Sequence, residues 1–249
     1  SQPTINATLR VSMALITVPA VTMMIGIMIR KKVLAPSVNW YGGAIEILGT
    51  SVDMTFESVS STNAVANGIF IGSGSTGTFT ITGLGNTVAD KDSGGIIDNA
   101  GANGVFIEGL DDVSITSLTV TNSTAGGIFL RAIQTSALVD NVTVDQFTTD
   151  GIAFVDFGSG ATATLLDSMI TGTAVGVLAQ NFSGSASFEA RGNMVTGSTV
   201  GILAQLFGDT ASATVSNNVL TGITNTGIAL TSIVSDGTFR IAENMVTGL

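Results

Sequence analysis

The chain of 249 residues contains neither cysteine nor histidine. Without cysteine there is no disulfide and no thiolate metal site, and the redox compartment stays open. Without histidine the chain lacks the commonest general base and the commonest zinc ligand. Aromatic residues make up 6% and include one Trp and one Tyr, so an aromatic platform for stacking sugars is not expected.

Basic residues are also scarce, and they are unevenly placed. The formal net charge is −10, which argues against nucleic-acid binding because that needs basic surface. Residues 1–32 carry four of the eight basic residues and no acid, whereas residues 33–249 carry the other four and all eighteen acids. The two parts should therefore attract each other, within one chain or between chains.

The amino-terminal segment is apolar, and its residue pattern favours a β-strand. Residues 11–29 are long and apolar enough to be considered as a transmembrane helix. However, apolar and polar residues alternate from Thr4 to Leu15, which is the period of a β-strand. We expect residues 1–37 to form a β-hairpin or extended arm with Pro19 at the bend, and a membrane span is the less favoured alternative.

A Gly-Ile or Gly-Val step recurs along the rest of the chain. The intervals are 36 residues and then 23, 24, 25, 25 and 26, and an earlier copy lies at Gly43. A period of this size indicates one structural unit stacked on itself. The glycines of the step are Gly68, Gly104, Gly127, Gly151, Gly176, Gly201 and Gly227.

Aligned on these glycines, the repeats share columns of similar residues. The first, third and sixth residues after each glycine are mostly apolar and should point inward, as Ile152, Phe154 and Phe157 do in one repeat. A polar column follows, and we expect it to form a hydrogen-bonded ladder at a corner. Its members are aligned as Thr119, Thr143, Ser168, Asn193, Asn218 and Asn244.

The run from Asn193 to Ile202 resembles the repeat of right-handed parallel β-helix proteins, the pectate-lyase-like superfamily, and Asn218 to Ile228 repeats it with one extra residue. The resemblance implies an all-β solenoid of three parallel sheets over residues 38–249. Its eight or so rungs would start near residues 43, 68, 104, 127, 151, 176, 201 and 227. The superfamily includes polysaccharide lyases and hydrolases, phage tailspikes and adhesins, so the resemblance does not define a function.

The second residue after each glycine should point outward, yet this column is also apolar. An exposed apolar stripe usually marks an interface; the alternatives are locally broken strand parity or a covering loop. Six rung steps span about 29 Å and an eleven-residue strand about 36 Å, so the arm is long enough to cover the stripe. The predicted assembly interface comprises Ile5, Leu9, Val11, Met13 and Leu15 of the arm and Phe70, Phe106, Phe129, Leu178 and Leu203 of the stripe.

The sequence given stops in mid-rung at Leu249, with no amphipathic cap. A bare terminal rung exposes strand edge and core. We therefore expect either that the natural protein continues or that another copy stacks there, which would build an open filament.

Residues suited to catalysis are sparse. Asp111 and Asp112 form the only adjacent acidic pair, and a solvated loop explains them better than a catalytic cleft. Asp90, Asp92 and Asp98 lie in a long insertion, residues 72–103, and are weak candidates for Ca²⁺ ligands because no EF-hand pattern surrounds them. The basic residues are scattered, and we expect no carboxylate–arginine constellation at matching positions of neighbouring rungs. No catalytic residue and no cofactor beyond that Ca²⁺ are predicted.

These features favour a non-catalytic, extracellular or cell-surface structural protein that forms a homo-oligomer or polymer through arm donation and through end-to-end or side stacking. The alternative is a polysaccharide lyase or hydrolase, or a tailspike-like fibre, acting on acidic polysaccharide. Asp111 or Asp112 would then work in the cleft.

Overall fold

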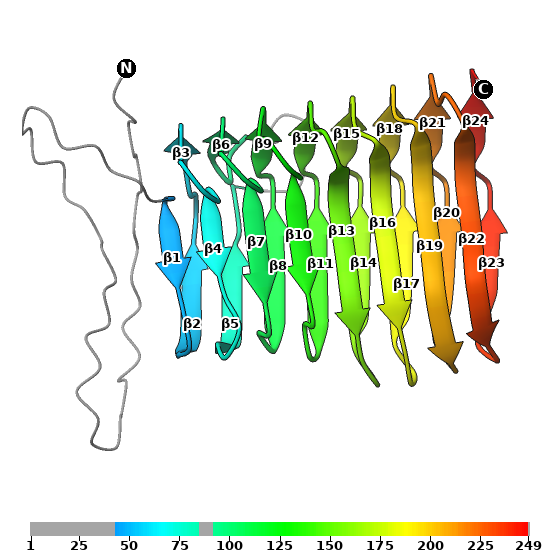
Figure 1. Cartoon of the computed structure of the whole chain (residues 1–249), viewed down its shortest axis with the longest axis horizontal. Coiled ribbons are helices and arrows are strands. Elements are labelled where there is room, and N and C mark those ends of the chain that lie inside the picture. The colour runs from blue at the N-terminus through cyan, green and yellow to red at the C-terminus, as the bar shows by residue number, and fades with distance from the viewer. Residues whose placement is uncertain (1–42, 85–91, 249) are drawn as a thin grey trace, which may run out of the picture.

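The computed structural model describes residues 43–84 and 92–248, and every regular element in that part is a β-strand. The chain winds through three parallel eight-stranded sheets, A, B and C, and each turn, or rung, contributes one strand to each sheet. Figure 1 shows the rungs following one another along the long axis of the molecule. The fold is the all-β solenoid of about eight turns that the repeat predicts. The arm proposed for residues 1–37, including its five interface residues, lies outside the described residues.

Sheet A has the longest strands, which lengthen toward the carboxyl end: β1 (Ile45–Ile47), β4 (Ile69–Ile71), β7 (Val105–Glu108), β10 (Ile128–Arg131), β13 (Asp150–Phe157), β16 (Val175–Phe182), β19 (Val200–Asp209) and β22 (Thr226–Ser235). Sheet B contains β2 (Ser51–Phe56), β5 (Thr76–Ile81), β8 (Asp112–Thr116), β11 (Ser136–Asp140), β14 (Thr162–Leu166), β17 (Ser187–Arg191), β20 (Ser212–Ser216) and β23 (Phe239–Ala242). Sheet C contains β3 (Ser61–Thr62), β6 (Ile96–Asp98), β9 (Thr119–Thr121), β12 (Thr143–Asp145), β15 (Met169–Thr171), β18 (Met194–Thr196), β21 (Val219–Thr221) and β24 (Met245–Thr247).

The inward columns of the sequence form one continuous core. Like residues pair in register across rungs; Ile128, for example, lies between Val105 and Ile152. The sixth-residue column packs most tightly: the rings of Phe157, Phe182 and Phe207 stack with centroids 5.0 and 4.7 Å apart. All three are fully buried. Because each rung offers only a thin layer of apolar surface, its burial depends on the rungs above and below.

The repeated glycine is required because a Cβ at its position would collide with the neighbouring rung. At the corner where sheet C leads into sheet A, a Cβ on Gly176 would lie 2.6 Å from the carbonyl oxygen of Gly201 and would collide with Val195. Gly151 has the same surroundings one rung earlier, against Gly176 and Ile170. The Gly-Ile step therefore marks a point where successive rungs approach too closely for a side chain.

The polar column forms a ladder, but over fewer rungs than the alignment predicted. The backbone N–H groups of Ser168, Asn193 and Asn218 each donate to the side-chain Oδ1 of the asparagine in the next rung, at 2.9–3.0 Å. Thr119 and Thr143 do not belong to it: Thr143 pairs in register with Met169, so Val142 lies opposite Ser168. The prediction was wrong by one residue because the corner between sheets A and B gains two residues in the Ser168 rung, whereas the alignment of Thr143 with Ser168 allowed for only one.

Residues 72–103 do not form a single insertion, which corrects the sequence prediction. They include two regular strands, β5 and β6, and the extra length lies between them. The corner between sheets A and B also changes along the molecule. Nine residues separate the inward-facing Ile128 and Ala137, whereas eleven separate Ile152 and Ala163 in the next rung. Rungs of different width thus stack within one solenoid.

We expect Gly176→Ala to destabilise the protein by roughly 1–3 kcal/mol, the usual cost of overpacking, because backbone as well as side chain must move. Urea unfolding followed by far-UV circular dichroism measures the effect. Gly158→Ala is the matched control, since a Cβ there meets nothing within 4 Å. Equal stability of the two variants would contradict the steric explanation.

We expect Asn218→Ala to destabilise the protein by about 1–3 kcal/mol for each buried partner that it orphans. Asn218 is fully buried; its side chain accepts from the amide of Asn193 and donates to Ala190 O at 3.0 Å. Thermal unfolding checks this, with the exposed Asn225→Ala as the control. A shift no larger than the control's would show that water replaces the ladder.

Candidate functional site

The apolar stripe lies on the outer face of sheet A. Phe70, Phe106 and Phe129 pair in register on β4, β7 and β10, between buried inward neighbours, and each is half-buried. Their rings touch, with centroids 5.5 and 5.3 Å apart. Strand parity is therefore intact, which removes one alternative explanation of the stripe. That the stripe is an assembly interface stays a prediction.

Beyond Phe129 the next two residues of the stripe are more deeply buried than the three phenylalanines. Ala153 and Leu178, which follow Phe129 in register, are 1% and 8% exposed, and Leu203 on β19 is half-buried. Large neighbours on both sides shield the small Ala153. The column is thus one contiguous apolar surface.

A cluster of charges that was not predicted from the sequence lies beside the stripe. Arg131 on β10 lies opposite Glu108 on β7, with Nη1 3.8 Å from Oε1, and its Nε donates to Asp156 Oδ2 of β13 at 2.6 Å. Asn181 of β16 donates to the other oxygen of Asp156 at 2.6 Å. The expectation of no carboxylate–arginine constellation was wrong. Glu108 and Arg131 both stand four residues after their glycines, so the alignment contained the signal.

The contacts within the cluster favour the charged forms of Asp156 and Arg131. Burial alone would raise the pKa of Asp156, but hydrogen bonds from Asn181 and Arg131, together with the charge of Arg131, outweigh burial and lower that pKa. The hydrogen bond to Asp156, the charge of Asp156 and that of Glu108 raise the pKa of Arg131. Arg131 is therefore a permanent cation and Asp156 an anion at neutral pH, so neither suits general acid–base catalysis.

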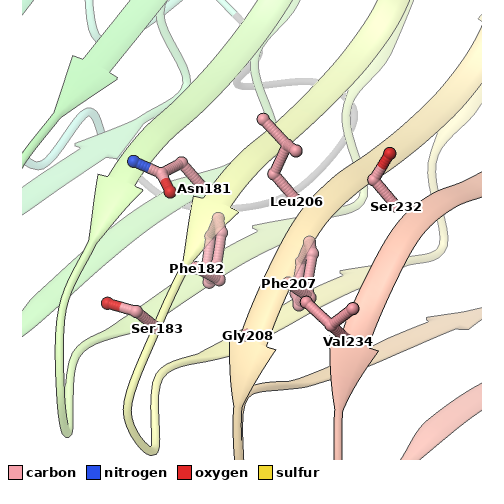
Figure 2. Close-up of a pocket in the computed structure, with 8 residues that line it drawn as sticks. All are labelled: Asn181, Phe182, Ser183, Leu206, Phe207, Gly208, Ser232 and Val234. Carbon is pink, nitrogen blue, oxygen red and sulfur yellow. The ribbon is translucent and has the colours of Figure 1, made fainter.

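A shallow groove of about 240 Å³ lies at the far end of β16, β19 and β22. Figure 2 shows the parallel rings of Phe182 and Phe207 in the groove, with Asn181, Leu206 and Ser232 in a row across the three strands. Those three residues have positive φ angles of 60°, 58° and 53°, which bend each strand and turn Leu206 outward. The groove lining has no ionisable side chain, so it offers apolar contact, hydroxyls and an amide but no proton transfer.

The adjacent acids have structural partners. Asp111 accepts a hydrogen bond from the amide of Gly77 at 2.8 Å, and Asp112 accepts one from the hydroxyl of Ser136 at 2.6 Å. Each carboxylate therefore links neighbouring rungs. The pair is not a solvated loop alone, because Asp112 begins strand β8.

Two of the three candidate Ca²⁺ ligands are described. Asp98 is the last residue of β6 and accepts from Thr121 Oγ1 at 2.8 Å and Asn122 Nδ2 at 2.9 Å; Asp92 accepts from Thr119. Asp90 lies outside the described residues. Across 43–84 and 92–248 no group of three acids gathers that could hold a metal ion. In the same ranges no helix is long and apolar enough to span a membrane, and residues 11–29 fall outside them.

Three parallel sheets wound into one coil define a parallel β-helix. The family model for the right-handed β-helix region matches residues 43–244, so the chain belongs to the right-handed β-helix family. No curated protein and no solved structure matches the chain. The family establishes the fold, and the function has to be argued from the surfaces.

The titration of two aspartates provides a test of the electrostatics. Burial raises the pKa of Asp150, so its charge opposes folding at neutral pH, and this penalty disappears as the pH falls through that raised pKa. Asp150→Asn should therefore be more stable than the wild type at pH 7, and the difference should close as the pH approaches the ordinary value of 3.8.

Asp156→Asn is the matched opposite, because the lowered pKa of Asp156 stabilises the fold above 3.8 and that contribution is lost in stronger acid. It should be less stable than the wild type at pH 7. Thermal unfolding between pH 2.5 and 7 would detect both, and shifts of the same sign would refute the assignment.

Proposed function

We propose that this β-helix is a non-catalytic structural protein, outside the cell or at its surface, that polymerises by stacking the carboxyl-terminal rung of one copy on the amino-terminal rung of the next. The observation that carries the proposal is the exposure of inward-facing apolar residues on the last described rung. Ile241 and Val246 point inward but are 49% and 37% exposed. Their register partners one rung earlier, Val215 and Leu220, are at most 1% exposed.

The two end rungs have matching columns. On the last rung the inward residues of sheets A and B include Ile228, Leu230, Phe239 and Ile241. The corresponding residues of the first rung are Ile45, Ile47, Met54 and Phe56. All eight are apolar. A second copy placed one rung step away therefore meets like residues, as neighbouring rungs do inside the solenoid.

Strand edges at the two ends support the same contact. In the described ranges β22, β23 and β24 pair on one side only, and so do β1, β2 and β3. Parallel pairing across the joint would satisfy these edges and continue all three sheets. The joint would meet a change of corner width, but such a change already occurs between β10 and β13. A contact between two different ends is heterologous, so it propagates into a filament.

The composition supports the extracellular placement: the chain is rich in small polar residues and glycine and has few charges. The alternative, action on acidic polysaccharide as an enzyme or tailspike-like fibre, draws support from Glu108, Arg131 and Asp156 on an exposed sheet face. The lowered pKa of Asp156 counts against the enzymatic form of this alternative, because it makes the carboxylate a weaker proton acceptor.

Ile241→Glu should abolish stacking, because it buries an unpaired charge in the joint. In sedimentation velocity we expect the wild type to shift toward multiples of 25.1 kDa as its concentration rises, and the variant to sediment as single chains. Thr231→Glu, on the outer face of the same rung, is the control and should assemble like the wild type. A wild type that stays a single chain at all concentrations would refute the proposal, as would an Ile241→Glu variant that still polymerises.

A further inference from the structure

The stripe on sheet A has the form of a binding surface independently of the ends. It runs along the solenoid axis through residues that pair in register from rung to rung: Phe70, Phe106, Phe129, Ala153, Leu178 and Leu203. The next outward column on one side is mostly polar: it contains Glu108, Arg131, Val155, Gln180 and Gln205. An apolar strip with a polar rim is the usual pattern of a surface that binds another segment.

We propose that residues 4–15 of the same chain bind along this stripe, with Ile5, Leu9, Val11, Met13 and Leu15 facing it. This contact does not depend on the end-to-end assembly proposed above. Four properties of residues 4–15 favour this segment as the partner of the stripe: its alternating pattern, its length, the charge around it and its closeness in the chain.

Pattern and length agree. The segment alternates, so in extended form its apolar side chains lie on one face while Thr4, Asn6, Thr8, Arg10 and Ser12 lie on the other. Its residues 5–15 span about 36 Å, and the column from Phe70 to Ala229 spans about 29 Å. The segment therefore covers the whole stripe and leaves its polar face to water.

Charge favours the same occupant. Residues 1–32 contain Arg10, Arg30, Lys31 and Lys32 and no acid. The stripe's column begins at the exposed Glu46, in register with Phe70, and Glu108 stands in the neighbouring outward column. A second acidic solenoid body docked side by side would meet repulsion, whereas the basic segment meets attraction.

Proximity favours the same chain over a neighbour. Residues 16–42 connect the segment to the first rung, and the stripe begins on the second rung, at Phe70. A tether of this length holds the segment at a high effective concentration near the stripe, so the intramolecular contact forms before an intermolecular one at ordinary protein concentrations.

The lack of cysteine makes a direct test simple. In the full chain, Val11→Cys is combined with Phe129→Cys in one variant and with Leu203→Cys in another, and both are treated with a short bis-maleimide. We expect an internal cross-link in each, seen by mass spectrometry of peptides from the band of single-chain mass. Far-UV circular dichroism verifies that each variant is folded. If the variant with Phe129→Cys is not folded, the variant with Leu203→Cys provides the test.

Val11→Cys with Ser114→Cys is the matched control, because Ser114 points outward from sheet B with similar burial. Its cross-linking yield should be at least tenfold lower. Equal yields in sheets A and B, or no cross-link in a folded stripe variant, would overturn the proposal. Cross-linked dimers would overturn it too, because the occupant would then be a neighbouring copy.

Discussion

The structure depends on one constraint: the backbone of each rung finds its hydrogen-bond partners in the rungs on either side. Twenty-one parallel strand pairings meet this need along the described chain. Because the rungs must lie one strand spacing apart, about 4.8 Å, side chains stack like on like, and any bulk at a tight corner is excluded. The glycine column at Gly151 and Gly176, the stacked rings of Phe157, Phe182 and Phe207, and the asparagine ladder are three consequences of that single spacing.

The same constraint explains why the outer face of sheet A differs from the others. Sheet A lengthens toward the carboxyl end, and from β13 onward a residue with positive φ bends each of its strands just beyond the outward column. Two consecutive residues of a rung can then point outward. Arg131, in the outward column, meets Asp156 from the bend of the next rung, and Asn181 follows from the bend after that. A polar row thus forms beside an apolar one on a single face.

The period of the sequence was sufficient to predict the sheets, the inward columns and the position of the stripe, because strand alternation and rung spacing act over many repeats. It failed where one residue matters. Thr143 was assigned to the ladder although Val142 is the residue in register with Ser168, since the corner between sheets A and B gains two residues there and the alignment allowed for one. Asp156 was missed because its orientation depends on a left-handed backbone conformation that alternation does not reveal. Residues 1–15 lie outside the described residues, so their binding to the stripe stays a proposal.

The change of corner width has a consequence for any polymer of this protein. Rungs up to β10 are narrower between sheets A and B, and rungs from β13 onward are wider than they are by one to three residues. In the polymer proposed above, with the eight described rungs as its repeating unit, narrow and broad halves would alternate, so the fibre would carry a ridge about every 38 Å. Fibre diffraction would then contain an axial reflection at that spacing in addition to the strand repeat, and the asymmetric profile of each ridge would reveal the direction in which the chains point.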